Sequence, residues 1–151
     1  LAREFARAGQ EVEFVLRRAQ GEFLEEARDA FSIVDLKAAR VRNLPRALAG
    51  YLRQRQPDVL LAAMWPLTFI APLAARLASP KSRVLVSEHG ILSAQYRDWG
   101  LAHRIALRTT TGLGYRLAHH RIGVSNGVAQ DMASLDIVGT CWAGGEVNSL
   151  L

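Results

Sequence analysis

The sequence predicts an α/β fold in which helices cover a mostly parallel, doubly wound sheet. Short apolar, β-branched runs recur along the chain, and helical patterns of apolar residues separate the later runs. The runs are too short for helices and too apolar for strands with one face in water. This is typical of strands that are buried on both faces of a parallel sheet. Strands that alternate with helices at this spacing form right-handed β-α-β units.

Five runs predict the strands of this sheet. They span residues 12–16, 31–36, 58–63, 83–87 and 121–125. Before the first strand, residues 1–8 have the pattern of an amphipathic helix, which Gly9 is expected to end at its C-cap.

Four further helices are predicted between and after the later strands. The first has leucines every four residues, at Leu44, Leu48 and Leu52, with Pro45 in its first turn. The last is expected from Ser125 to about Leu135. The apolar residues that mark the two helices between them are Ile70, Leu73, Ala74 and Leu77, then Leu101, Ile105, Leu113 and Leu117. Ser79 and Pro80 should stop the second helix, and a TTTG segment (109–112) should weaken the third.

The composition is that of one globular domain. Of 151 residues, half are hydrophobic and 22% are charged. The single cysteine, Cys141, excludes an internal disulfide framework and a cysteine-based metal cluster, and a reducing, cytoplasmic setting is expected. The longest uncharged run, residues 59–75, is interrupted by Pro66 and Pro72, so it is expected in the core rather than across a membrane.

The positive charge is concentrated in the middle of the chain. Residues 36–121 hold 14 basic and 3 acidic side chains, a net +11, against +5 for the whole chain. This favours an anionic partner such as a phosphorylated substrate or acidic lipid head groups. No aromatic residues are interleaved as in a nucleic-acid-binding module, so nucleic acid is not expected. A basic membrane-binding surface is one alternative, and its expected residues are Arg42, Arg46, Arg53 and Arg55.

A binding site is expected where the strands end, because open parallel sheets bind ligands outside the carboxyl ends of their strands. Four strand tips are candidates: Arg17-Arg18, Met64-Trp65-Pro66, Glu88-His89-Gly90 and Ser125-Asn126-Gly127.

His89 follows an apolar strand directly, within the segment RVLVSEHG (83–90). An imidazole there can hydrogen-bond a sugar hydroxyl or shuttle a proton. The alternative is a histidine that only satisfies a loop carbonyl, and the residues leave both open. Ser87, Glu88 and His89 do not predict a catalytic triad, because alternation along a strand directs Glu88 away from its two neighbours.

Residues 123–127 (GVSNG) match the G-x-S-x-G motif of a hydrolase nucleophile elbow. That fold places its acid and its histidine after the serine, whereas all four histidines here precede Ser125. Ser125 is better interpreted as the cap of the last helix, whose free N–H groups can hold an anion or hydroxyl. A serine hydrolase fragment using Ser125 stays an alternative. His103, His119 and His120 lack the spacing of a metal pair, so no metal is expected, and no Walker A or G-x-G-x-x-G motif occurs.

Four segments, in order, resemble the N-terminal domain of GT-B-type, family 4 glycosyltransferases. They are residues 1–12 (LAREFARAGQEV), 55–60 (RQPDVL), 87–89 (SEH) and 125–132 (SNGVAQDM). The resemblance covers about residues 1–135 and implies a Rossmann-like sheet in one domain of a GT-B architecture.

The resemblance also implies a chemistry. Such enzymes transfer a sugar from a nucleotide-sugar to an acceptor, usually with retention and without a metal, and their N-terminal domain shapes the acceptor side. The nucleotide-sugar is a co-substrate held mainly by the C-terminal domain, so no cofactor is expected. The resemblance assigns catalysis to His89, beside the transferred sugar. It assigns substrate binding to Glu88, Gly90, Trp65, Ser125 and Asn126.

The basic acceptor side suits an anionic or lipid-linked acceptor and peripheral contact with the inner face of the membrane. The chain departs from the family at both ends. The family's first strand would precede Leu1, and residues 136–151 (DIVGTCWAGGEVNSLL) do not continue its pattern. We therefore expect an incomplete domain over residues 1–135, an atypical tail over 136–151, and no activity by the chain alone. A non-catalytic remnant is the remaining alternative.

Overall fold

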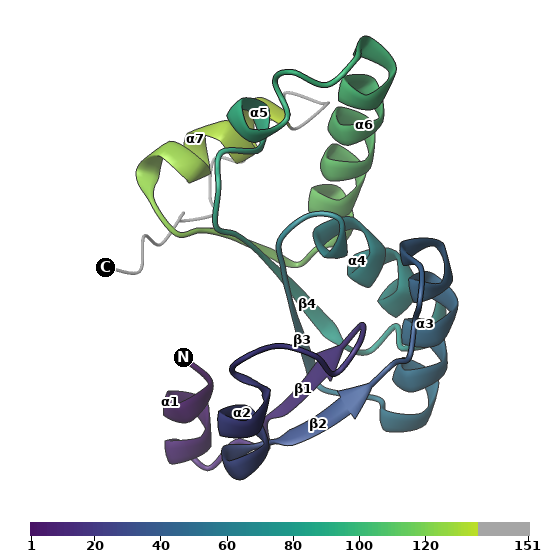
Figure 1. Ribbon diagram of the computed structural model, residues 1–151, viewed down its shortest axis with the longest axis vertical. Helices are drawn as coiled ribbons and strands as arrows, with labels where there is room; N and C mark the ends of the chain where they lie inside the picture. The colour runs from purple at the N-terminus through teal and green to yellow at the C-terminus, as the bar shows by residue number, and fades with distance from the viewer. Residues whose placement is uncertain (136–151) are drawn as a thin grey trace. The chain divides into compact units, whose positions relative to one another are not determined.

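The computed structural model describes residues 1–135, in which parallel strands alternate with helices (Figure 1). The chain divides into two compact units, the first spanning Leu1–Tyr51 and the second beginning at Leu52. The predicted parallel α/β class is confirmed, with the strands in two small parallel sheets. The predicted tail over 136–151, which includes Cys141, lies outside the described residues.

The first unit contains a two-stranded sheet. Its elements are α1 (Ala2–Arg7), β1 (Glu13–Leu16), α2 (Leu24–Ala30) and β2 (Ser32–Asp35). β1 and β2 pair in parallel, and the rings of Phe14 and Phe31 meet edge to face with centroids 5.2 Å apart. α2 was not predicted, because its sequence LEEARDA carries too few apolar residues to show a helical period.

Gly9 ends α1 as predicted. Its φ of 80° lies in the left-handed region that favours glycine. The N–H groups of Gly9 and Gln10 donate to the carbonyls of Ala6 and Phe5, each at 3.0 Å. This pair of hydrogen bonds is the Schellman motif.

A short 3-10 turn, η1 (Val41–Asn43), leads into α3 (Leu44–Arg55), where the chain passes from the first unit to the second. The predicted leucine stripe is confirmed. Leu44, Leu48 and Leu52 are all buried, and none is more than 4% exposed.

The second unit holds the larger sheet. Its strands are β3 (Val59–Ala63), β4 (Arg83–Glu88) and β5 (His120–Gly123), all parallel and in the order β3-β4-β5. Its helices are α4 (Leu67–Ala78), α5 (Leu92–Gln95), α6 (Leu101–Leu117) and α7 (Asn126–Leu135). α4 ends before Ser79 and Pro80, as predicted.

Burial distinguishes the central strand from the edge strand. On one face of β4, Val84 and Val86 are at most 1% exposed, and on the other Leu85 is half-buried and Ser87 is 7% exposed, as expected for a strand covered on both faces. In β3, Val59 and Leu61 are 56% and 41% exposed. The prediction that every strand is buried on both faces is therefore wrong for β3, which lies at the edge of its sheet.

α6 runs unbroken through the TTTG segment, but it packs with a different face from the one predicted. Leu107, Thr111 and Tyr115 are buried, whereas Leu101 and Ile105 are 73% and 55% exposed. α6 lies beside α4 (Figure 1), and the approach is close. A Cβ atom added at Gly114 would lie only 2.4 Å from the carbonyl oxygen of Thr68, so this contact requires glycine.

None of the helices within residues 1–135 has the length and apolar character needed to cross a bilayer. The uncharged run 59–75 forms β3, the following turn and most of α4.

Candidate functional site

Three of the four predicted strand tips lie side by side in the second unit. The strand register pairs Ala63 with Ser87 and Glu88 with Gly123, so the three strands end at the same level. Beyond the strands, the N–H of Met64 donates to the Ser87 carbonyl at 3.0 Å. The N–H of Val124 donates to the Glu88 carbonyl at 3.3 Å. The turns after β3, β4 and β5 therefore form one edge, with the β4 tip in the centre.

The β4 tip presents His89 to solvent. The His89 imidazole is exposed, and its Nε2 lies 3.3 Å from the hydroxyl of Ser87, which is 7% exposed. Either group can be the donor, depending on the histidine tautomer. The contact orients the ring and leaves Nδ1 as the nitrogen that can bind a hydroxyl or exchange a proton.

Glu88 points into the interior, away from Ser87 and His89 as strand alternation predicted. It is 1% exposed, and its Oε1 accepts hydrogen bonds from the Thr68 hydroxyl at 2.7 Å and the Tyr115 hydroxyl at 3.3 Å. The backbone N–H of Trp65 also donates to this carboxylate. Burial raises the pKa of Glu88, and the hydrogen bonds from Thr68, Tyr115 and Trp65 oppose that rise.

One carboxylate thus connects the central strand to three other elements. Trp65 follows β3, Thr68 belongs to α4 and Tyr115 belongs to α6. Burial and the neighbouring Glu88 charge also raise the pKa of the Tyr115 phenol, so this hydroxyl stays protonated and keeps its proton for the hydrogen bond. Thr68 and Tyr115 were not predicted as part of the site, because helical spacing does not show which strand residue they contact.

Trp65 belongs to an aromatic cluster that consists of Trp65, Tyr96, Trp99 and His103. The half-buried Trp65 indole donates to the Thr110 hydroxyl at 3.3 Å and meets the Tyr96 and Trp99 rings edge to face, at 5.5 and 6.1 Å. The Trp99 centroid is 4.4 Å from that of Tyr96 and 5.6 Å from that of His103. The spacing of three and then four residues between 96, 99 and 103 was the sequence signal for this cluster, and it was missed.

The β5 tip consists of Ser125, Asn126 and Gly127, all exposed. The Ser125 hydroxyl accepts the N–H of Val128 at 3.4 Å, so Ser125 caps α7 as expected. A Cβ atom at Gly123 would lie 2.8 Å from the backbone nitrogen of Ala129, which is why α7 can pack so closely on β5. Among the described residues no histidine hydrogen-bonds Ser125, so the geometry supports capping rather than a nucleophile elbow.

The segment after His89 is held beside the start of α7. The Asp131 carboxylate accepts the N–H of Ser93 at 3.2 Å. A Cβ atom on Gly127 would lie 3.8 Å from the terminal methyl of Ile91. Gly90 is half-buried, and a Cβ atom there would make only an ordinary 3.5 Å contact with Gln95. The segment that follows the β4 tip therefore packs against α7, which follows the β5 tip.

The other histidines have structural positions. The N–H of Val84 donates to His119 Nδ1 at 3.0 Å, so this nitrogen carries no proton and the side chain ties the start of β5 to β4. His120 is the first residue of β5. In the part of the chain that the structure describes, no group of three or more His, Cys, Asp or Glu side chains is arranged to hold a metal.

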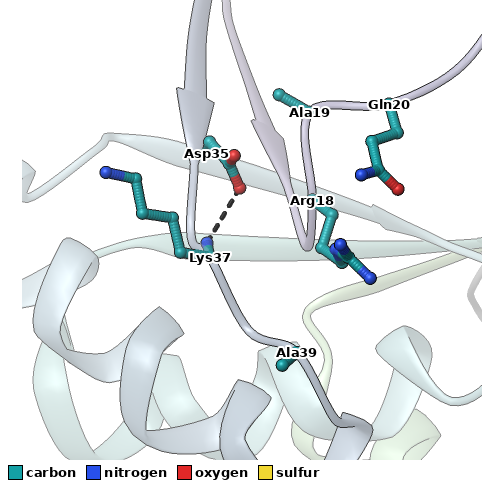
Figure 2. A pocket seen from close by; sticks show the side chains of 6 residues that line it. All are labelled: Arg18, Ala19, Gln20, Asp35, Lys37 and Ala39. Atoms are coloured by element: carbon teal, nitrogen blue, oxygen red, sulfur yellow. Dashed lines mark hydrogen bonds between the residues drawn. The ribbon is translucent and has the colours of Figure 1, made fainter.

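The fourth tip, Arg17-Arg18, lies in the first unit and borders a separate hollow of about 320 Å³ (Figure 2). Arg18 and Gln20 line it from the β1 end, and Asp35 and Lys37 from the β2 end. Asp35 accepts the backbone N–H of Lys37 at 2.8 Å, and this hydrogen bond lowers its pKa. Arg17 instead donates to the carbonyls of Ala38 and Ala39, both at 3.2 Å, and so holds the loop after β2.

A comparison with known families agrees with this geometry. The family model described as Glycosyltransferase Family 4 matches residues 1–139. The chain belongs to glycosyltransferase family 4. No curated protein sequence matches it. The predicted family and its enzyme class are thus confirmed, and all three adjoining tips lie within the matched part of this family 4 glycosyltransferase.

Proposed function

We propose that this family 4 chain forms the acceptor side of a glycosyltransferase that moves a sugar, with retention, from a nucleotide-sugar to an anionic acceptor. The observation that carries the proposal is the exposed His89 imidazole. It stands at the carboxyl end of the central strand, oriented by Ser87, between the Met64-Trp65-Pro66 tip and the polar Ser125-Asn126-Gly127 tip. Ligands of open parallel sheets bind at this position.

In this proposal each tip has a different task. His89 lies beside the transferred sugar, where an imidazole can hydrogen-bond a hydroxyl or exchange a proton. Ser125 and Asn126 offer exposed polar groups at the start of α7, where free N–H groups favour an anion. Trp65, which follows β3, lies at one edge of the proposed site. Gly90, which follows His89, forms part of its backbone surface. Glu88 acts from the interior as a positioning residue, because its buried carboxylate holds the tip that carries His89.

The donor nucleotide is proposed to bind mainly to a C-terminal domain, as the GT-B resemblance implies. The 151-residue chain alone is then expected to bind an acceptor without catalysing transfer, because a bound donor is needed to complete the reacting geometry. Incubation of the chain with labelled UDP-glucose and glucose 1-phosphate should give no glycosylated product. Product formed above the level without protein would contradict this expectation.

NMR of the histidine side chains tests the acceptor site. The chain has four histidines, and His89→Asn identifies the imidazole signals of residue 89. Titration with glucose 1-phosphate, an anionic sugar probe, should shift the His89 signals saturably, with little change at His103 and His120. Glucose and UDP serve as the neutral and the nucleotide probes.

Variants at the β5 tip and the UDP probe test which ligand and which residues are involved. Ser125→Ala/Asn126→Ala should weaken binding of glucose 1-phosphate by several-fold, whereas Ser134→Ala on the same helix should not. Tighter binding of UDP than of glucose 1-phosphate at His89 would contradict the acceptor assignment. Backbone amide shifts confined to the hollow lined by Arg18 and Asp35, with no histidine signal moving, would place the sugar in the first unit instead.

A further inference from the structure

α6 carries a second stripe of residues that does not take part in the packing described above. Leu101, Arg104, Ile105 and Arg108 follow one another at i, i+3, i+4 and i+7, so they lie on one face of the helix. All four are exposed, and the two apolar side chains among them are 73% and 55% exposed. In Figure 1 the first turns of α6 project beyond the sheet, and its later turns lie beside α4.

The charge along this stripe is positive, and the nearest carboxylate before it in the sequence is Asp98, which lies 3.9 Å from Arg97. No acidic residue occurs in the sequence between Asp98 and Asp131. Within residues 1–135, neither the Arg104 nor the Arg108 guanidinium lies within ion-pair distance of a carboxylate. The stripe therefore combines exposed apolar groups with two cations and has no anion of its own to balance them.

We infer that this face of α6, made of Leu101, Arg104, Ile105 and Arg108, docks on an anionic lipid bilayer. The apolar side chains enter the head-group layer and the arginines pair with lipid phosphates, as in interfacial amphipathic helices. Two exposed aliphatic residues form too small an apolar centre for a stable protein interface, which needs about 1,000 Å² or more. The same features suffice for weak, reversible lipid binding.

Vesicle co-sedimentation of the full 151-residue chain tests this inference. The chain should bind vesicles of phosphatidylglycerol and phosphatidylcholine, bind pure phosphatidylcholine much less, and dissociate as salt is raised. Arg104→Gln/Arg108→Gln should lower the partition coefficient by about 30-fold, since each arginine near an anionic surface contributes about fivefold. Arg46→Gln/Arg53→Gln removes the same charge from α3 and should change it by no more than about twofold.

A second pair of variants separates apolar insertion from charge. Leu101→Ser/Ile105→Ser should lower binding by at least tenfold. Leu77→Ser/Leu113→Ser alters two other exposed leucines, 71% and 45% exposed, and should have little effect. Circular dichroism checks that each variant is folded.

Three outcomes would overturn the inference. They are no preference for anionic vesicles, equal losses in the α6 and α3 arginine pairs, or a larger loss in the α3 pair. The last would assign lipid binding to the surface around Arg42, Arg46, Arg53 and Arg55. The assay contains no sugar, so its result is independent of the test of His89.

Discussion

The hydroxyl of Thr68 donates a 2.7 Å hydrogen bond to the carboxylate of Glu88, and both side chains are at most 1% exposed. The bond joins the first turn of α4 to the last residue of β4. The next residue is His89, which we propose to lie beside the transferred sugar. An interior contact therefore fixes where the exposed imidazole stands, and its strength can be measured.

Glu88 should make the stability of the protein depend on pH. Burial holds its pKa in the folded state above the ordinary glutamate value of 4.5, so the folded chain binds this proton more tightly than the unfolded chain. The contribution of Glu88 to stability is then complete below about pH 4.5 and is lost as pH rises through the folded-state pKa.

Glu88→Gln removes this titration. Relative to wild type, the variant should gain stability as pH rises from about 4 to 8, whatever its absolute stability at low pH. Urea unfolding of both proteins across this range measures the difference. Parallel curves would show that the carboxyl of Glu88 titrates in the folded state as it does in the unfolded chain.

Thr68→Val should destabilise the protein by about 1–3 kcal/mol, because it leaves a buried carboxylate without its shortest hydrogen bond. Thr109→Val is the matched control. The Thr109 hydroxyl is exposed and bonds only to carbonyls of its own helix, so the cost there should stay within about 0.5 kcal/mol. Equal losses in the two variants would indicate that the Thr68–Glu88 bond contributes nothing specific.

Gly114→Ala should destabilise the protein by about 1–3 kcal/mol, because the new methyl group would overlap the Thr68 carbonyl and push α6 away from α4. Gly50→Ala tests the opposite case. Gly50 also lies within a helix, but a Cβ atom there would meet nothing within 4 Å. That variant should gain about 0.5–1 kcal/mol from helix propensity, and thermal unfolding of both proteins compares them.

Asp35 should titrate below the ordinary aspartate pKa of 3.8, because the backbone N–H of Lys37 stabilises the ionised form. Its support for the turn after β2 is therefore present above about pH 4 and is lost as the pH falls. The carboxyl carbon of Asp35 and the amide of Lys37 should show the same NMR midpoint. A midpoint at or above 3.8 would mean that the hydrogen bond is absent in solution.

The strands were predictable because each is marked by a local run of apolar residues. Each of the five predicted runs overlaps a strand of the structure to within a few residues at its ends, and the helix of Leu44, Leu48 and Leu52 was predicted with its packed face. For α6 the same reasoning chose the wrong face. Its packed residues include Thr111 and Gly114, which a hydrophobic period does not register, because close approach to α4 favours small side chains there.

The arrangement of the strand tips was predictable, but their side-chain contacts were not. Strand ends indicated His89 as a candidate, and alternation indicated that Glu88 points away from Ser87 and His89. The partners of Glu88 were not predictable, because Thr68 and Tyr115 lie 20 and 27 residues away along the chain. The hydrogen bond between Ser87 and His89 follows from their shared face, which sequence alternation already implied.

The strand tips differ in how many hydrogen bonds their side chains make. Substitution should therefore be tolerated at one tip and not at the other. Residues 68, 88 and 115 share one carboxylate, so engineering any of them requires compensation at the other two. Asn126 and Gly127 are exposed, and Ser125 adds one long cap bond. If the acceptor binds as we propose, randomising positions 125–127 in a library should change acceptor choice at little cost in stability, while the tip that bears His89 is left intact.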